Sequence, residues 1–150
     1  MKSLLILGAG GFGRMIKETA LALGYEEVLF LDDTAKDDDV IGRCCDYHLY
    51  HRDYSVAVAA FGNNKTRLFW TQKLLEEEYE VPAIVHPSAI VSPSVRLEPG
   101  CFIMQRAVVN MNTTIKMAAL INSGAVVDHD SIVEEGAHVG LGSVVKAHCV

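Results

Sequence analysis

The sequence predicts a chain of two parts, a parallel α/β half with a βαβ unit, followed by a parallel β-helix. Two observations lead to this prediction. A glycine-rich turn joins an apolar strand to a helical segment near the N-terminus, as in nucleotide-binding βαβ units. A six-residue repeat then runs from Ser88 to Val150 without a break. We therefore divide the chain into an N-terminal domain at 1–85 and a second domain at 86–150.

The first strand and the first helix frame a glycine motif. Residues Ser3–Leu7 form a continuous apolar run, which is typical of a buried parallel strand. The next six residues fit G-x-G-x-x-G, and helical spacing follows from Arg14 to Leu23. Free N–H groups at such a helix start can hold a phosphate. The candidate substrate-binding residues here are Gly8, Gly10, Gly11 and Gly13.

A second strand is expected at Val28–Leu31, and it ends in Asp32 and Asp33. An acid at this place often contacts the ribose of a bound nucleotide, so both aspartates are candidate substrate-binding residues. Two alternatives remain open. In the first, the glycines are required only to pack the helix on the strand. In the second, the aspartates belong to a solvated acidic loop that continues to Asp39.

A third buried strand is expected at Ser55–Phe61, where Gly62, Asn63 and Asn64 turn the chain into a helix that runs to about Tyr79. Gly62 and Asn63 are further candidate substrate-binding residues. Asn63 or Asn64 is the expected N-cap of that helix.

A short fourth strand is expected at residues 81–85, and a short edge element around residues 48–50. About four parallel strands make a Rossmann-like half, whereas a full dinucleotide fold has about six. A nucleotide that carries a sugar therefore fits this half better than NAD does.

The second half repeats two positions every six residues. One is always aliphatic, and the position two residues earlier is small or β-branched. A fixed hexapeptide period marks a parallel β-helix, in which three hexads form one triangular coil. The 63 residues from Ser88 make about 3.5 coils of 18 residues. The aliphatic positions are Val91, Leu97, Ile103, Val109, Ile115, Ile121, Val127, Val133, Val139 and Val145.

His129 stands at a corner of this repeat, flanked by Asp128 and Asp130. An imidazole titrates near neutral pH, which suits a general base in acyl transfer. A carboxylate that accepts the ring N–H fixes the tautomer and stabilises the imidazolium that forms. Either aspartate can fill that role, and an exposed corner histidine without a catalytic role is the alternative.

Composition excludes several functions. The net charge of −6, without a Lys/Arg cluster, argues against a nucleic-acid or anionic-membrane surface. The apolar run Leu4–Leu7 is too short for a signal peptide, and no segment reaches the length of a membrane span. The four cysteines form no C-x-x-C pair, so we expect no metal site, reduced thiols and a cytoplasmic protein.

This order of parts resembles the bacterial sugar O/N-acetyltransferases, the family of sialic-acid O-acetyltransferases and UDP-4-amino-sugar N-acetyltransferases. The resemblance implies a left-handed β-helix and an acetyl-CoA-dependent transfer to an amino or hydroxyl group. The implied acceptor is a UDP- or CMP-linked sugar, or sialic acid. The matching pieces are Gly8–Gly13, Phe30–Asp33, Phe61–Asn64 with Arg67, His86–Ala89 and Ile121–Asp130.

The resemblance also implies roles for single residues. His129 is the general base and Asp130 orients its ring, while His138, with Gly140, lies by the acyl-CoA thioester. The N-terminal half holds the nucleotide-sugar, and acetyl-CoA lies between neighbouring β-helices of a homotrimer. Asn122 lines the same cleft as a substrate-binding residue, or forms an amide ladder along the helix. Phe12 stands where many relatives have a histidine.

Two other functions are compatible with parts of the sequence. The sequence ends at Val150 within a hexad, so we expect an incomplete β-helix. A nucleotide-sugar-binding or oligomerisation module without full catalytic activity is therefore the alternative. A metalloenzyme similar to the γ-class carbonic anhydrases is disfavoured. It needs one histidine pair five residues apart, whereas His129, His138 and His148 are nine and ten residues apart.

Overall fold

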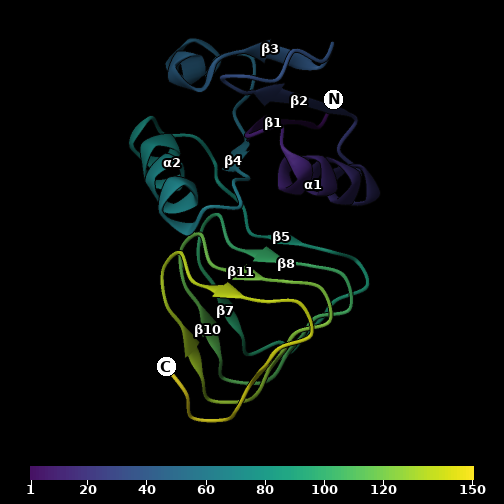
Figure 1. Ribbon diagram of the computed structural model, residues 1–150, viewed down its shortest axis with the longest axis vertical. Helices are drawn as coiled ribbons and strands as arrows, with labels where there is room; N and C mark the ends of the chain where they lie inside the picture. Colours follow the sequence, from purple (N-terminus) through teal and green to yellow (C-terminus); the bar gives the residue numbers. More distant parts are fainter. The chain divides into compact units, whose positions relative to one another are not determined.

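The computed structural model describes residues 1–150 as two compact units, Met1–Pro82 and Ala83–Val150 (Figure 1). Each unit has its own hydrophobic core. None of the helices has the length and apolar character that crossing a lipid bilayer requires.

The first unit is a four-stranded parallel sheet in the order β3-β2-β1-β4, with α1 and α2 on opposite faces (Figure 1). The central strand β1 is apolar and its last four residues are fully buried, which explains its place in the middle of the sheet. The elements are β1 Ser3–Leu7, α1 Gly11–Ala22, β2 Glu27–Leu31, β3 Val40–Gly42, the 3₁₀-helix η1 Cys44–Leu49, β4 Ala57–Ala59 and α2 Asn64–Glu76.

Two expectations for this unit are wrong. The fourth strand of the sheet is β3, which pairs with β2, and the edge element expected around 48–50 falls at the end of η1 and in the turn after it. Residues 84–85 do not join this sheet but form β5, which pairs with Phe102–Ile103 in the second unit. Val85 lies one hexad before Val91, so the repeat begins earlier than Ser88.

The second unit stacks eleven two-residue strands into three parallel sheets, which confirms the expected β-helix (Figure 1). Each strand pairs with the strand 18 residues later, as three hexads per coil require. The strands are β5 Ile84–Val85, β6 Ile90–Val91, β7 Arg96–Leu97, β8 Phe102–Ile103, β9 Val108–Val109, β10 Thr114–Ile115, β11 Leu120–Ile121, β12 Val126–Val127, β13 Ile132–Val133, β14 His138–Val139 and β15 Val144–Val145.

Both repeating positions of the hexad point into the core of the β-helix. The aliphatic residues of the central coils are buried, and the small residues two places earlier pack in the same cluster. Small side chains are needed there because each coil stacks directly on the next one. The fully buried members are Cys101, Ile103, Ala107, Val109, Ile115, Ala119, Ile121, Ala125 and Val127.

The corners of the β-helix follow a second rule, which concerns the backbone. From Gly100 on, every sixth residue has a positive φ, a backbone conformation that residues other than glycine adopt only at an energetic cost. Asp130 and His148 occupy this position in successive coils, with φ values of 54° and 59°. The full set is Gly100, Arg106, Asn112, Ala118, Gly124, Asp130, Gly136, Gly142 and His148.

Candidate functional site

The glycine loop lies at the carboxyl edge of the first sheet, where ligands bind in open parallel sheets. Gly8 follows β1 and donates its N–H to the carbonyl of Leu31, at 2.9 Å. Gly8 has a φ of +102°, and a Cβ there would lie 2.7 Å from the Ala60 carbonyl oxygen. A Cβ on Gly13 would lie 1.8 Å from the carbonyl oxygen of Gly8. These two glycines are therefore required for packing.

Gly10 and Gly11 are exposed, and a Cβ on either would meet no atom within 4 Å. Gly10 is the N-cap of α1, no side chain caps the helix, and its first turn contains no acidic residue. The first N–H groups of a helix have no partner within the helix, and the helix dipole adds positive potential there. This end of the glycine loop is thus able to hold a phosphate.

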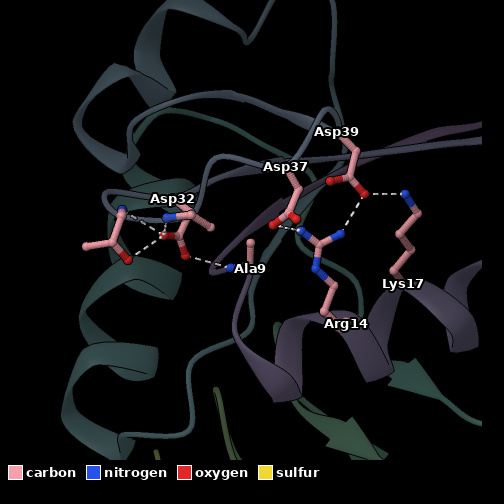
Figure 2. Close-up of polar contacts among 8 residues, drawn as sticks. Ala9, Arg14, Lys17, Asp32, Asp37 and Asp39 are labelled. Carbon is pink, nitrogen blue, oxygen red and sulfur yellow. Dashed lines mark hydrogen bonds and ion pairs between the residues drawn. The ribbon is translucent and has the colours of Figure 1, made fainter.

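Asp32 is engaged by the protein itself (Figure 2). Its carboxylate accepts the N–H groups of Ala9 at 2.7 Å, Thr34 at 2.9 Å and Ala35 at 2.8 Å. Partial burial acts to raise the pKa of Asp32, but these hydrogen bonds outweigh it and lower the pKa overall. Asp33 accepts the N–H of Cys44 at 3.0 Å. Both aspartates hold loops in place.

A pocket of about 450 Å³ opens beside these aspartates and is lined by residues 32–36 and 40–43. Its volume is within the range of small-molecule sites. Next to the glycine loop, Arg14 pairs with Asp37 at 2.9 Å and with Asp39 at 2.7 Å (Figure 2). Lys17 pairs with Asp39 at 2.6 Å. Carboxylates therefore neutralise the basic side chains nearest the loop.

The loop after β4 is held by a buried arginine. Arg67 is 0% exposed, and it donates to the carbonyl of Phe61 and to Oδ1 of Asn64, both at 3.0 Å. Burial lowers the pKa of Arg67 to about 10. Asn63 is the N-cap of α2 and accepts the N–H of Thr66 at 2.9 Å, as expected from the sequence. Gly62 is exposed, with open space around it.

In the second unit, the ring of His129 is bound by Asp130 and not by Asp128. Nδ1 of His129 lies 2.6 Å from Oδ2 of Asp130. Asp128 instead accepts the backbone N–H of His129 at 2.8 Å and the side-chain amide of Asn110 at 2.9 Å. The hydrogen bond to Asp130 raises the pKa of His129, and the same bond lowers the pKa of Asp130. The pair is half-exposed and accessible to a substrate.

His148 also lies at this corner, a residue for which no role was predicted from the sequence. Its ring packs edge-on against the ring of His129, with 5.3 Å between the centroids. The available signal was the period, since residue 148 follows residue 130 by one coil of 18 residues. The side-chain nitrogen and oxygen atoms of His129, Asp130 and His148 that could ligate a metal ion lie within 4.8 Å of one another. The closest two share a hydrogen bond at 2.6 Å.

His138 is the first residue of β14 and contacts Asn122, which follows β11 in the neighbouring coil. Nδ2 of Asn122 is 3.0 Å from Nε2 of His138, and Oδ1 of Asn122 accepts the N–H of Ser123 at 2.8 Å. Asn122 forms no amide ladder, because the sheet register puts Met104 and Gly140 at the equivalent positions of the neighbouring coils. One chain thus presents His129 at a corner of the β-helix and His138 on a different sheet of it.

Comparison with known proteins agrees with this architecture. Residues 3–74 match the family described as the PglD N-terminal domain. Over its whole length the chain is similar to the acetyltransferase domain of PglB from Neisseria gonorrhoeae FA1090, whose structure contains acetyl coenzyme A. That match has a TM-score of 0.81 and 27% sequence identity, and it covers 98% of this chain and 83% of the other.

Two more distant structures share the fold. A mutant of perosamine N-acetyltransferase from Caulobacter crescentus, in complex with CoA and GDP-perosamine, matches with a TM-score of 0.71 and 19% identity. The alignment covers 97% of this chain and 92% of that one. WeeI from Acinetobacter baumannii AYE matches with a TM-score of 0.63 and 12% identity, covering 96% and 88% of the two chains.

Together, these matches support the expected family, the bacterial sugar acetyltransferases, and with it an acyltransferase. They also agree with a left-handed form of the β-helix.

Proposed function

We propose that this protein is an acetyl-CoA-dependent acetyltransferase that acylates the amino group of a nucleotide-linked sugar. The observation that carries the proposal is the hydrogen bond of 2.6 Å between His129 and Asp130 at an exposed corner of the β-helix. Acetyl-CoA is supported as the donor by the PglB domain that contains it, and a nucleotide-linked amino sugar as the acceptor by the complex with GDP-perosamine.

The geometry suits base catalysis of amine attack on a thioester. Asp130 accepts a hydrogen bond from Nδ1–H of His129 and so holds the proton on Nδ1, which leaves the lone pair on Nε2 as the base. As the sugar amine attacks the acetyl carbonyl carbon, a C–N bond forms and Nε2 takes a proton from the nitrogen. The C–S bond then breaks, and the proton passes to the sulfur of CoA. Asp130 stabilises the imidazolium during this cycle.

We assign the acyl-CoA contacts to His138 and Gly140, and the phosphates of the sugar nucleotide to Gly10, Gly11 and the adjoining loop. A homotrimer is part of the proposal. His129 follows β12 and His138 begins β14, which belong to different sheets of one β-helix, so a neighbouring copy is needed to bring two such residues together. UDP- and CMP-linked sugars are the first acceptors to test. A cytoplasmic location is also proposed, because all four cysteines are free thiols.

The direct test is the release of CoA thiol from acetyl-CoA in the presence of UDP-, CMP- or GDP-linked amino sugars. We expect His129→Ala to lower kcat by roughly 10²- to 10⁴-fold, the usual contribution of a general base. The matched control is His86→Ala, an exchange of another histidine of the β-helix, which should retain activity. Unchanged thiol release in His129→Ala would remove His129 from the mechanism.

A binding module gives a different result in the same experiments. It predicts thermal stabilisation by the sugar nucleotide without thiol release from any acceptor. Sedimentation at several protein concentrations tests the trimer independently of activity.

A further inference from the structure

The geometry points to a site for a divalent metal cation such as Zn²⁺, formed by His129, Asp130 and His148 of a single chain, that inhibits acetyl transfer when it is filled. Metal binding follows from the cluster itself, and the inhibition rests on the proposed function. The sequence-based expectation of no metal site concerned cysteine pairs, whereas this cluster contains no cysteine.

Two imidazoles and one carboxylate form the ligand set. Imidazole nitrogen and carboxylate oxygen both bind Zn²⁺, at about 2.0–2.2 Å from the metal. One ligand atom from each of the three side chains lies within 4.8 Å of the other two. The ligand atoms of a tetrahedral zinc ion with such bonds lie roughly 3.3–3.5 Å apart. Small side-chain rotations reach that spacing, because His129 and Asp130 are half-exposed and His148 is exposed.

The repeat of the β-helix brings the three side chains together. Asp130 and His148 occupy the corner position with a positive φ in successive coils, which are stacked about 4.8 Å apart. The N–H of His148 donates to the carbonyl of His129 at 3.2 Å, and the N–H of Ile132 donates to the carbonyl of Cys149 at 2.8 Å. The backbone on both sides of His148 is thus fixed before any metal binds.

A second carboxylate adds negative charge at this corner. Asp128 accepts the side-chain amide of Asn110 at 2.9 Å and the backbone N–H of His129 at 2.8 Å, so its position is fixed. Its charge interacts with the imidazoles of both His129 and His148. Two carboxylates close to the cluster favour a divalent cation. The exposed side of the corner leaves room for a water molecule as a fourth ligand.

Zinc binding through either ring nitrogen of His129 ends its action as a base. A metal ion on Nε2 occupies the lone pair that takes the proton from the acceptor amine. A metal ion on Nδ1 replaces the proton that Asp130 holds there, and the neutral ring then carries its proton on Nε2. In both cases Nε2 has no lone pair to offer to the substrate.

Zinc titration of the full chain without substrates tests the site. Two-bond ¹H–¹⁵N correlation spectra report the ring nitrogens of each histidine. We expect the ring signals of His129 and His148 to change together and to saturate at one Zn²⁺ per chain. The signals of His86, which follows β5, should not change. A change at neither ring, a change at only one of them, or a change that continues beyond one equivalent overturns the inference.

His148→Asn removes one ligand and keeps the corner, because asparagine accepts a positive φ readily. We expect the zinc affinity, measured by calorimetry, to fall roughly 100-fold or more, since even the loss of an outer-shell partner costs 10- to 100-fold. His86→Ala is the matched control and should bind zinc as the wild type does. Equal affinities of the wild type and His148→Asn overturn the inference. The wild-type spectra decide the question if His148→Asn does not fold.

Activity measurements test the inhibition. The acetylated sugar is measured by chromatography, because Zn²⁺ also binds the free thiol of CoA. We expect Zn²⁺ to inhibit the wild type at the concentrations that saturate the ring signals, and EDTA to restore the rate. His148→Asn, compared with its own metal-free rate, should need roughly 100-fold more zinc. Zinc binding without inhibition of an active enzyme contradicts the inhibitory role.

The spectra and the calorimetry need no turnover. Zinc bound at this cluster in a protein that acetylates no sugar would therefore refute the proposed function and leave the metal site in place.

Discussion

The Nδ1 atom of His129 lies 2.6 Å from Oδ2 of Asp130, although the two residues are neighbours in the chain. Adjacent side chains normally point apart. Here Asp130 occupies the corner position with a positive φ of 54°, so the chain turns sharply between the two. Aspartate is among the few residues that accept this backbone conformation readily. The corner thus supplies both the turn and the partner of the imidazole.

Asp130→Asn is expected to impair catalysis and to move its pH dependence. The hydrogen bond to Asp130 is the main reason why the pKa of His129 is raised, so its loss lowers that pKa. A base works when deprotonated, and the acid limb of kcat/KM should therefore move to lower pH. An asparagine amide can also donate to Nδ1 and favour the wrong tautomer, so we expect kcat to fall by roughly 10²-fold or more.

Asp128→Asn is the control for that measurement. Asp128 contacts the backbone N–H of His129 and not its ring, and its charge contributes less to the raised pKa of His129. The acid limb should move less than in Asp130→Asn. Equal shifts in the two variants would contradict the assignment of Asp130 as the partner of the ring.

Gly13→Ala should destabilise the first unit. The added Cβ would lie 1.8 Å from the carbonyl oxygen of Gly8, which is backbone and cannot move aside. Overpacking of this kind costs about 1–3 kcal/mol or more. Gly11→Ala is the matched control in the same helix, because a Cβ there meets no atom within 4 Å. The urea concentration at the unfolding midpoint should fall for Gly13→Ala and not for Gly11→Ala. Equal midpoints for the two variants would show that α1 shifts to accommodate the added Cβ without loss of stability.

The sequence was sufficient for features that repeat or that have a local cause. The six-residue period predicted the β-helix, because an inward aliphatic residue is needed on each side of every coil. An N-cap at Asn63 or Asn64 was predictable, since an asparagine before a helix satisfies a nearby N–H, and the structure has it at Asn63.

Features that depend on pairing across long separations were not predictable. Residues 84–85 have the composition of a sheet strand, and only their register with Phe102–Ile103 shows which unit they join. The sequence did not show that Asp32, a candidate ligand contact, accepts the N–H of Ala9, 23 residues away. The contact between His148 and His129 could have been predicted only by applying the 18-residue coil repeat to the corner residues as well as to the core residues.

Asp39→Asn should lower the stability of the first unit in a pH-dependent way. Burial acts to raise the pKa of Asp39, but its bonds to Lys17 and Arg14 prevail and lower it. A lowered pKa means that the stabilisation is present above the unfolded pKa, near 3.8, and is lost as pH falls through the folded pKa. The groups are partly exposed, so we expect about 1 kcal/mol at pH 7.

Urea unfolding of the wild type and Asp39→Asn, at neutral pH and at about pH 3, checks this expectation. The difference in unfolding free energy between the two proteins should shrink on acidification. A difference that stays constant across this range would show that Asp39 acts through packing and not through its charge.

Arg67→Met tests the buried support of the loop after β4. The exchange keeps an apolar chain of similar length but removes the donors to the carbonyl of Phe61 and to Oδ1 of Asn64. Because Arg67 is 0% exposed, water does not readily replace those donors, and we expect a loss of about 3 kcal/mol in unfolding free energy.

Lys65→Met is the control for Arg67→Met, since Lys65 lies on the exposed side of the same helix and should change stability by less than about 0.5 kcal/mol. Sugar-nucleotide affinity, measured by calorimetry, should also fall in Arg67→Met, because Phe61–Asn64 adjoin the glycine loop at Gly8. Arg67 donates to the carbonyl of Phe61 and to Oδ1 of Asn64 in that segment. A variant that loses affinity while its unfolding free energy is unchanged would therefore assign Arg67 to the ligand itself and not to the loop.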